Sequence, residues 1–290
     1  MSNLHNAIKK HKISYTLIII ILVITAYMLN GLVQQSLILT VYDITCSTVS
    51  EQLDGYKIAH VSDFHSGLFS ETTTEIVKMI AEQNPNIICL TGDIVDSKTL
   101  DYESVEILIS GLTGIAPVFA VSGNNETSKP SIYEKMIEIY RKHGVQFIDG
   151  KSITKYDRDA VLTISGIKDA GNDSINIESE LMLLNNSYTK EGFGIILYHR
   201  ANEFDRIVKS RYDLVLSGHI HGGIVRFPLI GGLLSPDNEL FPSYSGGLYE
   251  KNGVYLVSNR GIGDNYPIPR IYNPPEVVIV VLHAKDDSYN

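Results

Sequence analysis

The chain has 290 residues, of which 44% are hydrophobic and 20% charged, a balance that excludes a wholly disordered protein and leaves room for one large domain or two small ones. All 33 acidic residues and 21 of the 24 basic residues lie from Asp43 onward, so this part carries a net charge of −12. Such a surface repels long polyanions. We therefore expect no nucleic-acid partner, and any bound phosphate should be accompanied by cations.

The N-terminal segment is basic and then continuously apolar. Residues 13–42 contain no charged side chain, and residues 17–24 are all aliphatic. That length suffices for a helix across roughly 30 Å of hydrocarbon. Because Lys9, Lys10 and Lys12 lie immediately before it, we expect the N-terminus to stay in the cytoplasm.

Two alternatives to a membrane anchor exist. A cleaved signal peptide is disfavoured because no small-x-small cleavage pattern follows the apolar core, and a buried core helix is disfavoured because no polar face interrupts the run. We predict a basic cytoplasmic tail at 1–12, a transmembrane anchor at 13–35, a linker with a lead-in strand at 36–55 and one domain at 56–290. The protein is expected to be a single-pass protein of the cell membrane with its domain outside the cytoplasm.

The rest of the chain alternates between apolar strand-like runs and amphipathic helical segments. After a lead-in strand within 37–49, buried strands are expected at 58–61, 87–90, 118–121, 145–148, 161–167, 193–198 and 214–216. Helices are expected at 72–83, 102–112, 132–142, 177–184 and 201–210. Short strands at 225–227, 254–258 and 277–282 are expected to form a second sheet. This order predicts an α/β domain with two packed sheets between helices.

The two cysteines, Cys46 and Cys89, are too few for a disulfide framework. Cys89 lies in an apolar run and has the character of a buried strand residue. We expect both to be free thiols.

Polar side chains follow five of the predicted strands. They are Asp63, His65, Asp93, Asn124, His199, His219 and His221. Side chains at i and i+2 of an extended segment point the same way, so His219 can act together with His221. Because ligands gather beyond the carboxyl ends of strands in open sheets, these seven residues are candidate site residues.

The chemistry of these side chains suits a metal centre. Two carboxylates, one amide and four imidazoles, with no thiolate, favour Mn, Zn, Fe or Co, and seven ligands are too many for one tetrahedral ion. A bridging carboxylate would divide them between two divalent ions roughly 3.5–4 Å apart, which can clamp a phosphoryl group in line and activate a bridging water as nucleophile. No Gly-x-Ser-x-Gly or Walker pattern offers another mechanism.

Each residue alone also has a structural interpretation. Asp63 or Asp93 could cap a helix, Asn124 could be a turn residue and His199 could be a satisfied histidine at a strand end. Four of the nine histidines, however, follow predicted strands. The joint pattern therefore favours the metal centre.

The motifs together resemble the calcineurin-like metallophosphoesterase superfamily. They are Asp63-x-His65, Gly92-Asp93-x-x-Asp96, Gly123-Asn124-x-Glu126, His199 and Gly218-His219-x-His221. Gly261-Ile262-Gly263 and the segment from Arg270 through Glu276 resemble the bacterial membrane-associated branch similar to YkuE and YaeI.

The resemblance implies a four-layer αββα sandwich with a dinuclear metal site. One ion would be held by Asp63, His65 and His221, the other by Asn124, His199 and His219, with Asp93 as the bridging ligand. Asp96 would be an outer neighbour at most, and Glu126 would support its loop.

One residue departs from the family pattern. The family has histidine where this chain has Asn125, and that histidine contacts the phosphoryl group and helps to protonate the leaving group. Asn125 can donate a hydrogen bond but cannot deliver a proton. Asn125 and Asp93 are the candidate catalytic residues.

Two functions are compatible with this pattern. The first is a membrane-anchored phosphohydrolase that acts on a small-molecule or lipid-linked phosphate of the envelope. The alternative is a catalytically weak or silent metal- and phosphate-binding module. The sequence points to no particular protein partner.

Overall fold

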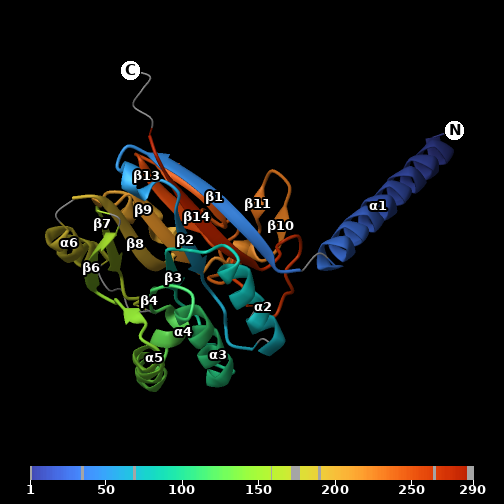
Figure 1. The fold of residues 1–290 in the computed structure, drawn as a ribbon. Coiled ribbons are helices and arrows are strands. Elements are labelled where there is room, and N and C mark those ends of the chain that lie inside the picture. Colours follow the sequence, from blue (N-terminus) through green and yellow to red (C-terminus); the bar gives the residue numbers. More distant parts are fainter. Residues whose placement is uncertain are drawn as a thin grey trace.

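Two six-stranded sheets pack face to face between helices, with one long helix projecting from the domain (Figure 1). The computed structural model describes residues 2–33, 36–67, 70–157, 159–170, 177–188, 191–263 and 266–285. Within these residues the order of layers is helices, sheet, sheet, helices. The expected four-layer αββα sandwich is therefore confirmed.

The first sheet brings the carboxyl ends of four parallel strands to one edge. Its order is β1-β14-β2-β3-β4-β5. The bounds are Ile38–Cys46 (β1), Tyr56–Val61 (β2), Ile87–Thr91 (β3), Val118–Val121 (β4), Gln146–Phe147 (β5) and Glu276–Ala284 (β14). Strands β2 to β5 are parallel, whereas β14 is antiparallel to β2 and parallel to β1.

The second sheet repeats this arrangement. Its order is β12-β13-β9-β8-β7-β6. The bounds are Lys151–Asp157 (β6), Ala160–Gly166 (β7), Phe193–Arg200 (β8), Leu214–Gly218 (β9), Gly247–Lys251 (β12) and Val254–Ser258 (β13). Strands β7, β8, β9 and β13 are parallel, and β6 and β12 are antiparallel edge strands. A separate ribbon pairs β10 (Arg226–Phe227) with β11 (Gly231–Gly232).

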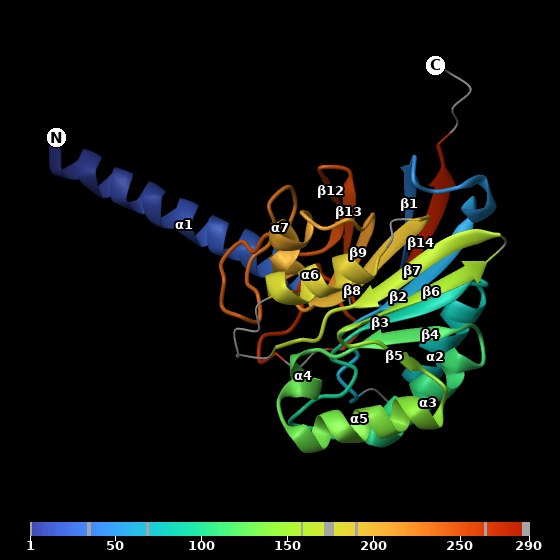
Figure 2. The ribbon, with the colours of Figure 1, turned by 90° about the vertical axis from the view of Figure 1, so that its left-hand side faces the viewer.

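The helices cover the outer faces of both sheets (Figure 2). On the first sheet lie α2 (Ser70–Ala81), α3 (Tyr102–Thr113) and α5 (Pro130–Lys142), and on the second lie α6 (Ile177–Ser187) and α7 (Phe204–Ile207). Short turns complete the fold: η1 (Glu51–Leu53), α4 (Asn124–Thr127), η2 (Ala201–Glu203) and η3 (His221–Gly223).

Burial on both faces explains the continuous apolar runs of the central strands. In β3, Ile88 and Leu90 belong to the core under the helices, whereas Ile87 and Cys89 belong to the core between the sheets. Successive side chains of a strand point to opposite faces, so a strand covered on both faces needs apolar residues throughout. Cys46 and Cys89 are free, as expected.

Two sequence-based expectations about the later strands and helices are wrong. The segment at 277–282 belongs to β14 in the first sheet, and only β13 of the three short strands joins the second. An apolar run with both faces buried fits inside either sheet, so its pattern does not select one. The helix expected at 201–210 is only the η2 turn followed by α7.

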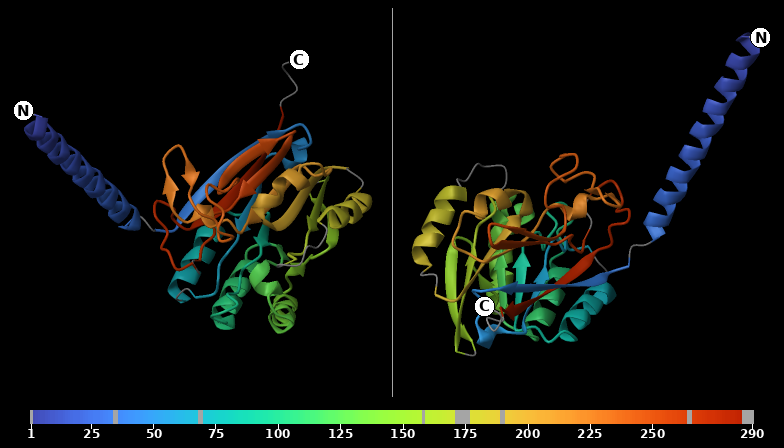
Figure 3. Two further views of the ribbon diagram at one scale, coloured as in Figure 1. Left: turned by 180° about the vertical axis from the view of Figure 1, so that it is seen from behind. Right: turned by 90° about the horizontal axis from the view of Figure 1, so that it is seen from above.

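Helix α1 (Ser2–Val33) extends away from the domain (Figure 3). Its stretch Tyr15–Val33 has a mean hydropathy of 2.4 and is long and apolar enough to cross a membrane. The end nearest the domain is docked: the Tyr27 ring lies 4.3 Å from the Tyr272 ring, and the Tyr272 hydroxyl donates to Asn30 Oδ1 at 2.8 Å.

Candidate metal centre

The strand ends bring the predicted site residues to one place between the two sheets. The His219 backbone N–H, beyond β9, donates to both carboxylate oxygens of Asp63, beyond β2, at 3.1 and 3.2 Å. His199 Nδ1, in β8, donates to the backbone carbonyl of Thr91 at the end of β3, at 2.7 Å. The two sheets are therefore joined through the site residues themselves.

The backbone at these positions is strained. Asp63, His65, Asp93, His219 and His221 all have positive φ, between 50° and 72°. A residue with a Cβ atom adopts this region at a cost of roughly 1–3 kcal/mol, and such residues gather at functional sites. The strain turns the chain sharply at each strand end and points the side chains inward.

One group of candidate ligands consists of Asp63, His65 and His221. The three ligand atoms lie within 4.8 Å of one another, and all three residues are buried. The Nε2 atoms of the two histidines are 3.0 Å apart, and His221 Nε2 lies 3.3 Å from Asp63 Oδ1. Buried nitrogen and oxygen donors at these distances fit one divalent cation.

The second group contains Asp93 and His199 and shares Asp63 with the first. Asp93 Oδ2 lies 3.5 Å from His199 Nε2 and 3.8 Å from His65 Nε2, so this carboxylate reaches both groups. Asn124 Oδ1 lies 3.2 Å from His199 Nε2. Both carboxylates thus lie between the histidines of the two groups, and the donor set fits a second cation.

His219 has two neighbours that the sequence analysis did not identify. Its Nε2 lies 2.8 Å from Asp237 Oδ2 and 3.2 Å from an Arg200 guanidinium nitrogen. Asp169 in turn accepts from Arg200 Nε at 2.7 Å. Arg200 directly follows His199 and could have been noticed, whereas Asp237 lies in an irregular Gly- and Pro-rich stretch that offers no local signal.

His221 has a different neighbour on its outer side. Its Nδ1 lies 3.1 Å from a terminal nitrogen of the buried Arg270, which also donates to the backbone carbonyls of Gly263 at 2.6 Å and Arg260 at 2.8 Å. An arginine can only donate, so His221 Nδ1 accepts. Asp96 stays further out, with Oδ2 at 4.0 Å from His65 Nδ1.

Glu126 holds the loops that carry Asp93 and Asn124. Its carboxylate accepts from the backbone N–H groups of Asp93 at 2.8 Å, Ile94 at 2.7 Å and Gly123 at 2.8 Å. Gly123 is required for this approach, because a Cβ atom there would lie 2.2 Å from Asp93 Oδ1. The expected supporting role of Glu126 agrees with these contacts.

The charges in the site are strongly coupled. Burial lowers the pKa of His65 to about 4, although Asp93 opposes this shift. Burial alone would lower the pKa of His199, but the adjacent Asp93 and Asp63 carboxylates raise it to about 10. Burial alone would raise the pKa of Asp63, but His221, followed by His199 and His65, holds it well below its usual range. The carboxylates therefore stay ionised at neutral pH.

Both polar atoms of the Asn125 side-chain amide form hydrogen bonds. Its Nδ2 donates to Asp93 Oδ2 at 2.5 Å, and its Oδ1 accepts from the Ser97 backbone N–H at 3.0 Å. Its own backbone N–H donates to Asp93 Oδ1 at 2.8 Å. The side chain is buried and acts on Asp93 directly.

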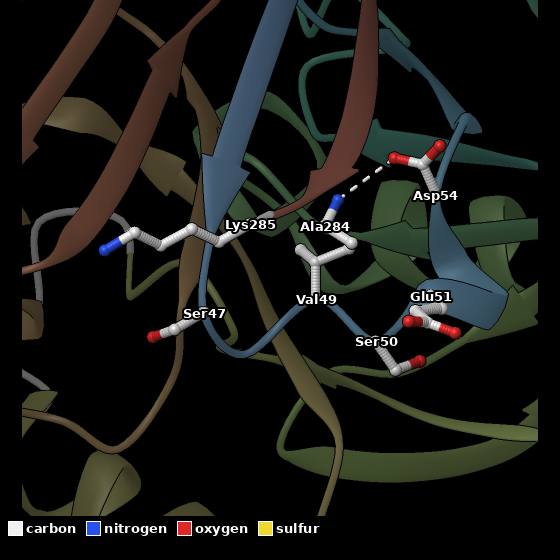
Figure 4. A pocket seen from close by; sticks show the side chains of 7 residues that line it. All are labelled: Ser47, Val49, Ser50, Glu51, Asp54, Ala284 and Lys285. Atoms are coloured by element: carbon white, nitrogen blue, oxygen red, sulfur yellow. Dashed lines mark hydrogen bonds between the residues drawn. The ribbon is translucent and has the colours of Figure 1, made fainter. Parts of the chain in front are cut away.

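A surface cavity elsewhere is unrelated to this centre (Figure 4). It is lined by Ser47, Val49, Ser50, Glu51, Asp54, Ala284 and Lys285. It lies beside the start of β2, whereas the metal centre lies beyond the other end of that strand. None of these lining residues is a histidine, although His283 Nδ1 lies 3.6 Å from Asp54 Oδ1.

Comparison with known proteins places the chain in a family. The model of the calcineurin-like phosphoesterase family matches residues 56–223. An uncharacterized metallophosphoesterase of Aquifex aeolicus is 30% identical over 240 residues, covering 79% of this chain and 85% of the relative. The phosphodiesterase YaeI of Escherichia coli is 26% identical over 233 residues, covering 78% and 82%.

A solved structure shares the fold. The crystal structure of TT1561 of Thermus thermophilus aligns with a TM-score of 0.50 at 13% identity, covering 71% of this chain and 89% of that one. With the sequence matches, the convergence of carboxylates and histidines at the strand ends leads to one conclusion: this chain belongs to the calcineurin-like phosphoesterase family, and it is a hydrolase that acts on phosphoester bonds.

Proposed function

We propose that the protein is a membrane-anchored phosphohydrolase that uses two divalent cations to hydrolyse a phosphate ester or pyrophosphate of the cell envelope. The observation that carries the proposal is the convergence of two buried carboxylates with the histidines of both groups. The name of the Escherichia coli relative, a phosphodiesterase, supports a diester among the substrates.

The ligands of the two cations are assigned as follows. Asp63, His65 and His221 would hold the first, and Asn124, His199 and His219 would hold the second. Asp93 would serve both, because its Oδ2 atom lies 3.8 Å from His65 Nε2 and 3.5 Å from His199 Nε2. Bound divalent cations supply Lewis-acid activation of the phosphoryl group and of the attacking water.

The protein's own residues fix this arrangement. The Thr91 carbonyl holds His199 with Nε2 turned toward Asn124. The amide of Asn125 orients Asp93, so it serves as a positioning residue and the leaving group departs without a proton from this position. We expect good leaving groups to be favoured, because general-acid help is typically worth about 10²–10⁴-fold.

The membrane topology follows from α1. We propose that 1–12 is a cytoplasmic tail, that 13–35 spans the cell membrane once, that 36–55 leads into the domain and that 56–290 is the catalytic domain outside the cytoplasm. An envelope substrate, soluble or lipid-linked, is within reach of a domain anchored in this way. Protease added to intact cells should digest the domain, and its protection would contradict this topology.

The test uses the full chain in detergent, depleted of metal and then loaded with Mn²⁺ or Zn²⁺. We expect two ions per chain and metal-dependent hydrolysis of an activated aryl phosphodiester. His199→Gln should lose both the second ion and the activity. The matched control is His283→Gln, which removes an exposed histidine paired with Asp43. Two bound ions without turnover would instead support a silent binding module.

A further inference from the structure

Five large apolar side chains are exposed on loops at one end of the domain. They are Leu229 (108% exposed), Ile230 (64%), Leu240 (65%), Phe241 (57%) and Ile268 (41%). Leu229 and Ile230 connect β10 to β11, and Leu240 and Phe241 lie in the loop after β11. Ile268 lies in the loop between β13 and β14, four residues before Tyr272. We call these five residues the apolar rim. Exposed apolar groups that cluster in this way mark interaction surfaces.

The rim lies beside the end of α1. Tyr27 stacks on Phe227, the last residue of β10, with ring centroids 5.8 Å apart, and its hydroxyl donates to the Arg226 carbonyl at 3.3 Å. A Cβ atom at Gly31 would lie 2.5 Å from Ile271, so the helix and the domain are in close contact there. Figures 1 and 3 show the β10–β11 ribbon rising next to this end of the helix.

The position of the membrane anchor determines what the apolar rim contacts. If Tyr15–Val33 crosses the bilayer, its docked end lies at the membrane surface, and so do the loops that contact it. Tyrosines in that contact, Tyr27, Tyr266 and Tyr272, match the aromatic residues that mark membrane interfaces. Apolar side chains of surface-bound segments enter the boundary between headgroups and acyl chains to a depth of about 5–10 Å.

We propose that the apolar rim is a second membrane contact, inserted into the lipid surface beside the anchor. The proposal rests on the membrane anchoring set out under the proposed function and goes beyond it, because it fixes the domain's orientation. The loop that carries Leu240 also carries Asp237, which contacts His219. The side of the metal centre bounded by this loop therefore faces the bilayer.

The chain contains no tryptophan, so a single introduced tryptophan reports its own depth. The full chain is reconstituted in phosphatidylcholine vesicles with and without brominated acyl chains, which quench tryptophan on contact. Ile230→Trp and Leu240→Trp test the rim. Leu22→Trp, within the apolar stretch of α1, is the positive control. Tyr156→Trp, 78% exposed in β6, is the control in the aqueous phase.

We expect quenching of the two rim tryptophans to be at least about threefold stronger than that of Tyr156→Trp, as for side chains at the acyl boundary. Quenching equal to Tyr156→Trp, with Leu22→Trp strongly quenched, would overturn the rim contact and leave the anchor intact. Rim tryptophans with blue-shifted but unquenched emission would overturn it in favour of a protein occupant. An unquenched Leu22→Trp would overturn the anchor itself.

Discussion

The two sets of proposed ligands differ in the residues that contact the outer nitrogens of their histidines. We call Asp63, His65 and His221 the first half of the metal centre, and Asn124, His199 and His219 the second half. In the first half, the outer nitrogen of His221 accepts from the positively charged Arg270. In the second half, the outer nitrogen of His199 donates to the Thr91 carbonyl. The outer nitrogen of His219 has the Asp237 carboxylate as its nearest neighbour, at 2.8 Å, with an Arg200 nitrogen further away at 3.2 Å. An acceptor behind a histidine orients the ring and strengthens it as a ligand, whereas a cation does the reverse.

This difference indicates that the two halves hold their cations unequally. While His221 accepts from Arg270 at Nδ1, the single ring proton is on Nε2. Metal binding through Nε2 would require that proton to move to Nδ1, which would break the bond from Arg270. His219 is in the opposite position. The carboxylate of Asp237 lies closer to its Nε2, at 2.8 Å, than the Arg200 nitrogen does, at 3.2 Å. A carboxylate can only accept, so Nε2 carries the proton and Nδ1 keeps its lone pair. We expect the second half to bind more tightly, and the following changes test the contrast.

Asp93→Asn should have the largest effect, because it weakens the one ligand proposed to serve both halves. We expect both ions to bind more weakly and hydrolysis of the activated diester to fall by about 10³-fold or more, since each ion is worth several kcal/mol. Metal content and turnover of the full chain measure this.

The matched control is Asp96→Asn. Asp96 Oδ1 accepts from the backbone N–H groups of Lys98 and Thr99 at 2.6 and 2.9 Å, and the carboxylate does not reach the second group. Its loss should leave the metal content unchanged. Equal effects of the two changes would contradict the bridging role of Asp93.

The sequence predicted the parts of this centre that strands position. Asp63, His65 and Asp93 follow short buried strands, and parallel pairing of β2 with β3 brings such ends together without further information. Asp237 could not be predicted, because it reaches His219 from an irregular loop whose path depends on tertiary contacts. The sheet that β14 joins also depends on tertiary contacts, because its apolar run satisfies either sheet.

Asp149 allows a pH test of the loop that carries Asn124, one of the proposed ligands in the second half. The loop begins after Ser122, and Asp149 contacts Ser122. The Asp149 carboxylate accepts from the Ser122 backbone at 2.9 Å and from the Tyr133 hydroxyl at 2.9 Å, and burial raises its pKa to about 6. A carboxyl whose pKa is higher in the folded state than in the unfolded state binds more protons when folded. Stability must therefore fall as the pH rises from about 4 to about 6.

Asp149→Asn should remove that decline. Relative to wild type, the variant should gain up to about 3 kcal/mol in free energy of unfolding between pH 4 and pH 7. Denaturation of both proteins in the same detergent at several pH values measures the difference. The exposed Asp54→Asn is the control, and a pH-independent difference for Asp149→Asn would contradict the raised pKa.

Asn125→His tests whether the missing proton donor limits turnover. We expect an unactivated alkyl diester to be hydrolysed about 10²-fold faster by the variant, the lower end of the usual range because the bond from Asn125 to Asp93 is lost. The activated aryl diester needs no proton on its leaving group, so it should gain little. An equal gain on both substrates would point to a change in metal binding instead.

Asp237→Asn should have the smallest effect and should make the two halves more alike. Without the carboxylate behind His219, we expect the second cation to bind about 10-fold more weakly, at the lower end of what outer partners of metal ligands contribute. Titration of the loaded full chain with a chelator should then remove both ions together, whereas wild type should release the first-half ion before the second.

Asp43→Asn is the matched control, because Asp43 Oδ1 lies 2.8 Å from His283 Nε2, the same distance as in the Asp237 pair, but on the outer strands β1 and β14. It should leave the chelator profile unchanged. If Asp237→Asn also leaves it unchanged, the carboxylate does not support a metal ligand. If the variant binds the second cation more tightly than wild type, Asp237 competes with that cation for His219. The second half would then be the weaker of the two in cation affinity.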